Sequence, residues 1–328
     1  MQKYLTLELQ DLKQASIGDT YENFMEEVNQ PNDPFRMIFE FTFSLDGRYE
    51  GQKNEFDRMH GKGSFATWNN DRIVGIWEDS ELKVGVNHEI YYSNGNQYIG
   101  NIQNYHLEGS GTLMFKNGSK YEGPFHLSQM SGEGSLYYSN EGNYYFGGFR
   151  ENKKQGKGTM VYSNGDKYFG DWHHDMRHGY GEYYYKKGDC WSGEFKFDNM
   201  RGLGFMEYQN GNIAKVLWRD THQLLSGQII YANGNAYLGQ FDNNLRNGTG
   251  TIIFKNKAKY RGTFANGNMH GDGKMVITKP QLQYQGFLHD FNLYRGSFFE
   301  NQRHGEGVFT YFNGDQYDGM FENNVRTG

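Results

Sequence analysis

Residues 165–188 read GDKYFGDWHHDMRHGYGEYYYKKG, and this stretch contains two patterns that indicate different kinds of protein. His173, His174, Asp175 and His178 are close enough in sequence to form a metal site. The same stretch contains Tyr-x-Gly-x-Trp followed by Gly-x-Gly, an alternation of aromatic residues and glycines that is typical of strands and turns. Whether the second pattern is local or periodic decides between the two interpretations.

The second pattern is periodic. An aromatic-x-Gly triplet recurs at steps of 23 to 25 residues, apart from one step of ten between Tyr284 and Tyr294. With weaker copies at 73–75 and 214–216 there are 13 starts, and glycine is third in 12 of them. The full copies open at Tyr49, Tyr98, Tyr121, Tyr145, Tyr168, Trp191, Tyr237, Tyr260, Tyr284, Tyr294 and Tyr317. The chain is therefore built from internal repeats.

One unit is predicted to be a β-hairpin. Tyr168, Gly170 and Trp172 have the period of two that places side chains on one face of a strand, and the glycine leaves room for a ring to lie against the backbone. Gly-x-Gly then opens the return strand, and Asn-Gly closes the hairpin. The expected repeat core is represented by Tyr121, Gly123, Phe125, Tyr168, Gly170, Trp172, Trp191, Gly193, Tyr237, Gly239 and Phe241.

These residues resemble the MORN (membrane occupation and recognition nexus) repeat, whose signature is Tyr-x-Gly-x-Trp/Phe, a polar stretch, Gly-x-Gly and a Tyr-rich strand. The match covers residues 47–328, in about 12 hairpin units. The resemblance implies an all-β fold, an elongated, twisted, single-layer antiparallel sheet of stacked hairpins in an open, solenoid-like array.

Residues 1–46 lie outside the period. Asp19 and Glu22 fit a capping box, which predicts a short helix that ends before Pro31. The apolar positions of this helix are Tyr21, Phe24, Met25 and Val28. Residues 37–45 alternate as a strand does. The segment is expected either to cap the first edge of the sheet or to dock on another protein.

Two units depart from the pattern, at 85–87 in place of Gly-x-Gly and at 214–216 in place of the opening triplet. Trp77 and Trp218 keep the aromatic position in both units, so the sheet is expected to continue with altered curvature. Pro280, just before the short step, predicts an edge, a bulge or a kink, because proline cannot donate to a strand ladder. Either drift in a tolerant repeat or a bend that fits a partner explains these departures.

Periodicity also bears on the histidines. The slot that His178 occupies before Gly-x-Gly holds histidine in other units, but it also holds Gln155, Arg201 or Asn247. A set of metal ligands would not be exchanged so freely, so His178 is expected to be structural or solvated, and His173 and His174 to be loop residues. A metal site is the alternative, and no cofactor or metal is expected.

Composition disfavours several classes of protein. The net charge of −6 and the absence of a long basic block disfavour nucleic-acid binding. Cys190 is the single cysteine, which excludes an internal disulfide. The first residues lack the apolar run of a secretory signal, and no window approaches a membrane span. A cytoplasmic location is therefore expected.

Large apolar residues at variable positions predict a partner surface on the face of the sheet opposite the repeat core. The candidates are Met114, Tyr137, Tyr184, Ile253 and Val276, on which a partner helix or peptide would dock. Scattered surface residues or a second packed layer are the alternatives. Tyr317 and Phe321 mark a candidate open edge at the C-terminal end, where a second chain could add a strand.

The chain is not expected to be an enzyme, because no P-loop, HExxH or GxSxG motif occurs and few residues lie outside the repeats. Long arrays of this kind are most similar to the radial spoke head proteins of cilia and flagella, which implies a noncatalytic structural scaffold in the axoneme, a cytoskeletal complex. The alternatives are a cortical cytoskeleton scaffold or a membrane and phosphoinositide adaptor. The adaptor is disfavoured because basic residues occur only as pairs, such as Lys153-Lys154.

Overall fold

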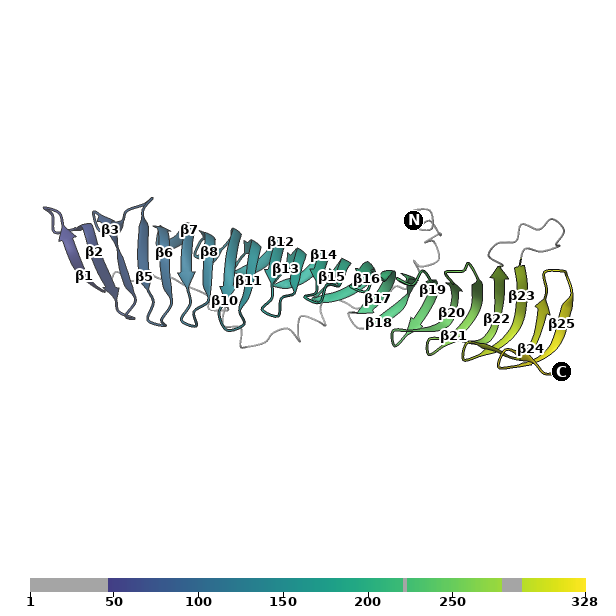
Figure 1. Ribbon diagram of the computed structural model, residues 1–328. Coiled ribbons are helices and arrows are strands. Elements are labelled where there is room, and N and C mark those ends of the chain that lie inside the picture. Colours follow the sequence, from purple (N-terminus) through teal and green to yellow (C-terminus); the bar gives the residue numbers. More distant parts are fainter. Residues whose placement is uncertain (1–46, 221–222, 279–290) are drawn as a thin grey trace. The chain divides into compact units, whose positions relative to one another are not determined.

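The computed structural model describes residues 47–220, 223–278 and 291–328, which form β-strands joined by short turns and contain no helix (Figure 1). The all-β prediction is therefore confirmed. The helix predicted after Asp19 and the strand predicted at 37–45 lie outside the described residues. The strands are β1 (Gly47–Lys53), β2 (Met59–Thr67), β3 (Arg72–Glu78), β4 (Glu81–Leu82), β5 (Asn87–Tyr91), β6 (Gln97–Gln103), β7 (His106–Met114), β8 (Lys120–His126), β9 (Gln129–Met130), β10 (Gly132–Tyr138), β11 (Asn143–Arg150), β12 (Lys153–Val161), β13 (Lys167–His173), β14 (Met176–Tyr184), β15 (Cys190–Lys196), β16 (Asn199–Glu207), β17 (Ile213–Asp220), β18 (Gln223–Ile230), β19 (Ala236–Asp242), β20 (Leu245–Ile253), β21 (Lys259–Ala265), β22 (Asn268–Thr278), β23 (Phe291–Phe299), β24 (Gln302–Thr310), β25 (Gln316–Glu322) and β26 (Val325–Arg326).

The strands form a single antiparallel sheet in which, apart from the two-residue strands β4 and β9, each strand pairs with the next in sequence. For example, β13 pairs with β12 on one side and with β14 on the other. The two-residue strands β4 and β9 pair with the ends of β3 and β8, and β5 and β10 continue the pairing with the same strands. Among the described strands β1 pairs only with β2, and β26 only with β25, so the sheet is open.

Two kinds of corner alternate along the sheet. The corner at His174 and Asp175 is a two-residue turn in which both residues have positive φ (49° and 69°), as in a type I′ hairpin. The predicted Asn-Gly corner follows β12, where the Tyr162 amide donates to the Asp166 carbonyl at 3.0 Å and Gly165 takes a φ of 94°. Both corners match the right-handed twist of adjacent strands, which lets short hairpins follow one another.

A row of glycines crosses the sheet from strand to strand. Gly158 pairs with Gly170, Gly170 with Gly181, and Gly181 with Gly193. A Cβ atom on Gly170 would lie 2.4 Å from the Tyr168 hydroxyl and 2.6 Å from the Gly181 Cα. The glycine is therefore required because the tyrosine two residues earlier folds its ring flat over the bare backbone of both strands.

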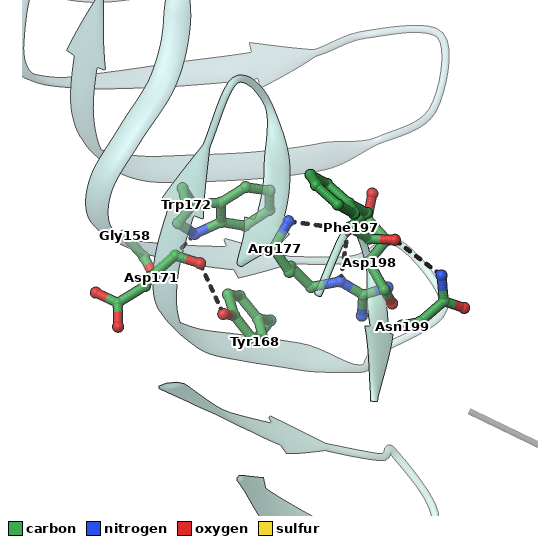
Figure 2. A network of polar contacts seen from close by, with 8 residues as sticks. All are labelled: Gly158, Tyr168, Asp171, Trp172, Arg177, Phe197, Asp198 and Asn199. Carbon is green, nitrogen blue, oxygen red and sulfur yellow. Dashed lines mark hydrogen bonds and ion pairs between the residues drawn. The ribbon is translucent and has the colours of Figure 1, made fainter. Parts of the chain in front are cut away.

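The rings themselves form a zigzag that runs from Tyr98 to Trp191 and again from Tyr237 to Tyr317. Tyr168 makes an edge-to-face contact with Trp172 of its own strand (5.3 Å between centroids) and another with Phe195 of the next unit (5.0 Å). The Tyr168 hydroxyl donates to the Asp171 carbonyl at 2.9 Å, and the Trp172 indole donates to the Gly158 carbonyl at 3.3 Å (Figure 2). Tyr168 is thereby fully buried in a single-layer sheet. This interlocking explains why an isolated hairpin would be marginal while the array is stable.

The unit that opens at Ala214 departs from the pattern at two coupled positions. Ala214 provides no ring, and Val216 takes the place of the glycine, paired with Gly204 on one side and Gly227 on the other. Ala214 and Val216 are both fully buried. The valine side chain therefore fills the space that the missing ring would have occupied, and β17 pairs with both β16 and β18, with register shifts on either side of Trp218 in the pairing with β18.

The unit that opens at Ile73 compensates differently. Ile73 provides no aromatic ring, and His88 of β5 stands where other units have the second glycine of Gly-x-Gly, paired with Gly100. A Cβ atom on Gly75 would lie 2.1 Å from His88 Nδ1, so the imidazole covers this glycine instead of a tyrosine. His88 Nε2 lies 2.9 Å from the Lys83 carbonyl, and burial lowers the pKa of this fully buried imidazole. As predicted, the sheet continues through both departures.

Side-chain hydrogen bonds join successive hairpins at both ends of the strands. At the Asn-Gly end, Asp166 Oδ1 accepts from the Lys186 amide at 2.8 Å. At the type I′ end, Asp175 Oδ1 accepts from the Lys154 amide at 2.8 Å. Equivalent bonds are accepted at the Asn-Gly end by Asp71, Asn96, Ser119, Asn143, Asp189, Asn212, Asn235 and Asn292, and at the type I′ end by Ser128, Asn152, Asp198, Asn244, Asn301 and Asn324. These bonds fix the position of each hairpin on the next.

The short step in the repeat does not remove strands from the sheet. β22 pairs directly with β23, and Met275 lies opposite Tyr294, as Tyr183 lies opposite Trp191 in the regular part. Tyr294 therefore opens the unit that follows Tyr260. Pro280 and Tyr284 lie outside the described residues.

Candidate partner-binding face

The two faces of the sheet differ in what they leave exposed. We call the face with the opening aromatic residues and the glycine row the ring face, and the opposite face the outer face. Tyr98, Tyr121, Tyr145, Tyr168 and Tyr237 of the ring face have no exposed surface. Because its rings cover one another and the backbone, the ring face offers a partner little apolar surface.

Long side chains at the type I′ end of the strands pack over the rings of the ring face. The Arg177 guanidinium lies 5.7 Å from the centre of the Tyr168 ring and 5.1 Å from that of Phe195. Arg177 Nε also donates to Asp198 Oδ1 at 2.9 Å, which holds the cation in place (Figure 2). The same position, nine residues after the opening residue in most units, holds Leu107, Met130, Lys154, Met200, Arg246, Met269 and Arg303. An apolar chain or a cation with a long stem can therefore serve this role.

The residues expected to form the repeat core lie on the ring face. Trp191 and Tyr237 are fully buried, Trp172 is 4% exposed and Phe241 is 7% exposed. Gly123, Gly193 and Gly239 belong to the glycine row. The other candidates, which are predicted to bind a partner, are therefore expected on the outer face, which is the exposed one.

The five apolar candidates on the sheet lie on one line across the outer face. We call this line the first outer row; it contains the residues that precede each opening aromatic residue and their cross-strand partners. From β7 to β23 it is Met114, Lys120, Tyr137, Tyr144, Val161, Lys167, Tyr184, Cys190, Glu207, Ile213, Ile230, Ala236, Ile253, Lys259, Val276 and Leu293. Tyr137, Tyr184 and Ile253 are 44%, 42% and 41% exposed.

Sequence reasoning missed a second line of apolar residues on the same face. This second outer row lies two residues from the first on each strand and includes Phe146, Phe169 and Phe205, which are 51%, 51% and 43% exposed. Phe146 and Phe169 each lie opposite Thr159 of the strand between them, so exposed rings recur on every second strand there. The signal was present in the sequence, because both rings are the middle residue of the aromatic-x-Gly triplet.

Comparison with known proteins identifies the repeat. The family model described as "MORN repeat" matches residues 98–120, 121–142, 145–167, 168–190, 191–213, 237–259, 260–278 and 294–316, more than half of the chain. The chain belongs to the MORN-repeat family. These eight matched repeats lie between Tyr98 of β6 and Gln316 of β25, and their hairpins are the units described above. MORN repeats characterise this chain as a protein-interaction scaffold.

Two of the matching solved structures are distantly similar to this chain, and no curated protein matches. One neighbour is the TCP10 domain of Danio rerio CPAP in complex with a peptide of STIL, with 10% identity and a TM-score of 0.37, covering 80% of this chain and 100% of that chain. Another is the TCP domain of Drosophila melanogaster SAS-4 with a proline-rich motif of Ana2, with 18% identity and a TM-score of 0.25, covering 54% of this chain and 84% of that chain. At these TM-scores the similarity carries no argument about the ligands of this MORN array.

The histidine tract is part of a MORN hairpin corner. His173 Nε2 lies 2.8 Å from His174 Nδ1, while Asp175 uses Oδ1 to accept from the Lys154 amide of the preceding hairpin. The His178 ring packs against Phe197 at 5.0 Å, and burial lowers the pKa of His178. In the described part of the chain no group of three or more His, Cys, Asp or Glu side chains is arranged to hold a metal ion. The described residues also include no helix that is long and apolar enough to cross a bilayer.

The two candidates at the C-terminal end occupy the ring face instead of an exposed edge. Phe321 is 2% exposed and packs against Tyr294 and Tyr317, at 5.0 and 5.3 Å. Its side chain is therefore not available to a partner. The backbone of β25 is paired with β26 only at Phe321 and Glu322, so the rest of this edge carries no strand among the described residues.

Proposed function

We propose that this chain is a noncatalytic scaffold that holds other proteins in a cytoskeletal assembly, and that this assembly is the axoneme of a cilium or flagellum, with the radial spoke head as its place. The proposal rests on the contrast between the faces. The ring face covers itself, while the outer face carries rows of exposed aromatic and aliphatic side chains along successive strands.

The arrangement of these rows supports docking through side chains. The backbone groups within the sheet are paired between strands, so a partner helix or peptide on the outer face must bind the side chains of Tyr137, Tyr144, Phe146 and their neighbours. At the edge of β25, in contrast, a partner strand could add to the sheet through its backbone. Both modes bind proteins, and neither needs a cofactor or nucleic acid.

The proposal assigns the buried polar groups of the ring face to packing. Burial raises the pKa of Tyr98, Tyr121, Tyr145 and Tyr168 well above the usual value, so these phenols stay protonated at neutral pH. Their hydroxyls donate to backbone carbonyls three residues later and serve packing. The proposed location, in the cytoplasm and within the axoneme, is supported by the resemblance of long MORN arrays to radial spoke head proteins.

Extraction of tagged protein from ciliated cells tests this function. We expect the unaltered chain to remain with the axoneme after detergent treatment. The variant Tyr137→Ser/Tyr144→Ser/Phe146→Ser should be released although it remains folded, because it loses exposed docking surface only. A matched variant at polar outer-face positions, Thr112→Ala/Ser135→Ala/Thr159→Ala, should be retained. Release of the unaltered chain with the membrane fraction, or a diffuse distribution without axonemal retention, would contradict the proposal.

A further inference from the structure

Three cations stand side by side on the outer face at the C-terminal part of the array. Arg261 of β21 lies directly opposite Lys274 of β22, and Lys274 lies directly opposite Arg295 of β23. All three side chains are exposed. Like charges at directly opposed positions destabilise a sheet, so this cation row works against the stability of the free protein.

Other cations on the outer face form ion pairs with nearby carboxylates. Arg48 pairs with Glu50 at 3.0 Å, Lys120 with Glu122 at 2.6 Å, and Lys157 with Asp171 at 2.7 Å. Within the described residues, none of the three cations in the row forms an ion pair or a side-chain hydrogen bond. The nearest carboxylate on the same face of β22, Asp272, accepts a hydrogen bond from Ser297 at 3.1 Å. The cation row is therefore uncompensated within the described part of the molecule.

A line of apolar residues, interrupted by the exposed Lys259, runs beside the cation row. The first outer row passes through Ile253, Lys259, Val276 and Leu293 on β20 to β23, two residues along each strand from the cations. Ile253 is 41% exposed. Two residues of a strand span about 6.7 Å, so the apolar line and the cation row form two parallel tracks less than a helix diameter apart. A ligand that fits both tracks must present carboxylates along one side and apolar groups along the other.

Spacing decides the conformation of such a ligand. Neighbouring strands are about 4.8 Å apart, so three cations on adjacent strands cover about 9.6 Å. A helix lying across the strands presents residues i, i+3 or i+4, and i+7 over about 10.5 Å, close to that length. An extended peptide presents its same-side residues about 6.7 Å apart, which gives about 13.4 Å over three positions. The helix fits one carboxylate to each cation, and the extended peptide does not.

We propose that the outer face of β21 to β23 binds an acidic amphipathic helix of a partner protein, with carboxylates on Arg261, Lys274 and Arg295 and apolar side chains on the line of Ile253, Val276 and Leu293. This inference rests on the proposed scaffold function only in taking the partner to be a protein. The attraction is electrostatic and specific to this part of the array, where the two outer rows carry cations and aliphatic residues instead of the aromatic residues of β10 to β14.

Binding of a synthetic peptide to the purified full-length chain tests the inference. The probe is a labelled peptide of about 20 residues with glutamate at i, i+4, i+7 and i+11 on one side and leucine on the adjacent side. Fluorescence anisotropy should show binding that weakens as salt is raised. The variant Arg261→Glu/Lys274→Glu/Arg295→Glu should weaken binding about tenfold or more, because three ion pairs become repulsive contacts.

A matched control separates this site from net charge. Lys62→Glu/Lys116→Glu/Lys186→Glu changes the charge of the chain equally at exposed lysines that form no ion pair among the described residues, and it should leave the affinity within about twofold. Equal loss in both variants would overturn the site. Equal binding of a peptide with the same composition in scrambled order would overturn the helical fit. Vesicles with anionic lipid that bind through the cation row while the peptide does not would replace the proposal with membrane binding. None of these outcomes depends on retention in the axoneme.

Discussion

The regular unit at β13 and the exceptional unit at β17 solve the same packing problem in different ways. In β13, Tyr168 lies over Gly170, and the glycine has no space for a side chain. In β17, Ala214 leaves that space open, and Val216 fills it. Neither change would be tolerated alone, since a ring with valine would clash and alanine with glycine would leave a cavity. The comparison shows that the ring and the bare backbone two residues later form one coupled unit.

High pH is expected to have the largest effect, and it should destabilise the units that open with tyrosine more than the unit that opens at Ala214. Burial raises the pKa of Tyr98, Tyr121, Tyr145 and Tyr237, and that of Tyr260 to about 12, whereas the usual value is 10.0. Above pH 10 the unfolded state loses these protons first, so stability present at neutral pH falls as pH rises. Each ring contributes up to about 1.4 kcal/mol per pH unit.

Absorbance of tyrosinate at 295 nm and hydrogen exchange, followed together, check this expectation. Ionisation and loss of the sheet should coincide between roughly pH 10 and 12. Hydrogen exchange in the strands next to Ala214 should change least, because that unit has no phenol at its opening position. Ionisation of all 26 tyrosines near pH 10 with the sheet intact would show that the rings are not buried.

Removing a single ring is expected to have the next largest effect. Tyr168→Ala should lower the free energy of unfolding by about 3–5 kcal/mol, because it removes a fully buried ring that touches Trp172 and Phe195. The adjacent Phe169→Ala, on a ring that is 51% exposed on the outer face, should change it by less than about 0.5 kcal/mol. Urea titration followed by hydrogen exchange in β12 to β15 measures both, and equal effects would mean that the faces are wrongly assigned.

Low pH should destabilise the unit that opens at Ile73, by less than the removal of a buried ring does. Burial lowers the pKa of His88 below its usual 6.5, so its contribution is present above about pH 6.5 and is lost as pH falls. Hydrogen exchange in β3 to β6 should speed up between pH 7 and 5 relative to β19 to β21, which contain no histidine. His88→Phe keeps a ring over Gly75 and should remove this pH dependence. Persistence of the effect in that variant would assign it to another group.

Much of the fold follows from the sequence because each MORN unit carries its own pattern. The alternation of Tyr168, Gly170 and Trp172 indicates a shared face, and the Gly-x-Gly and Asn-Gly positions indicate the hairpin. The bonds between hairpins could not be predicted, since Asp175 accepts from Lys154, 21 residues away, and the equivalent residues in other units include serine and asparagine. The role of His88 was hidden as well, because its imidazole replaces a ring from a different strand.

The candidate binding face was only partly predictable. Variable apolar residues such as Tyr137 and Tyr184 proved to lie on one row, because a period of two assigns them to the face opposite the rings. The cation row was not foreseen, because Arg261, Lys274 and Arg295 are far apart in sequence and only the register between strands brings them together. The prediction of Phe321 as an exposed edge residue is wrong, because the same spacing places it among the buried rings.

A double-mutant cycle in the regular unit tests the coupling of ring and glycine most directly. Tyr168→Ala and Gly170→Val should each destabilise the sheet, whereas the pair together imitates Ala214 and Val216. We expect the pair to be more stable than the sum of the single changes by about 1–3 kcal/mol in the free energy of unfolding, measured by urea titration. Additive effects within about 0.5 kcal/mol would contradict the account.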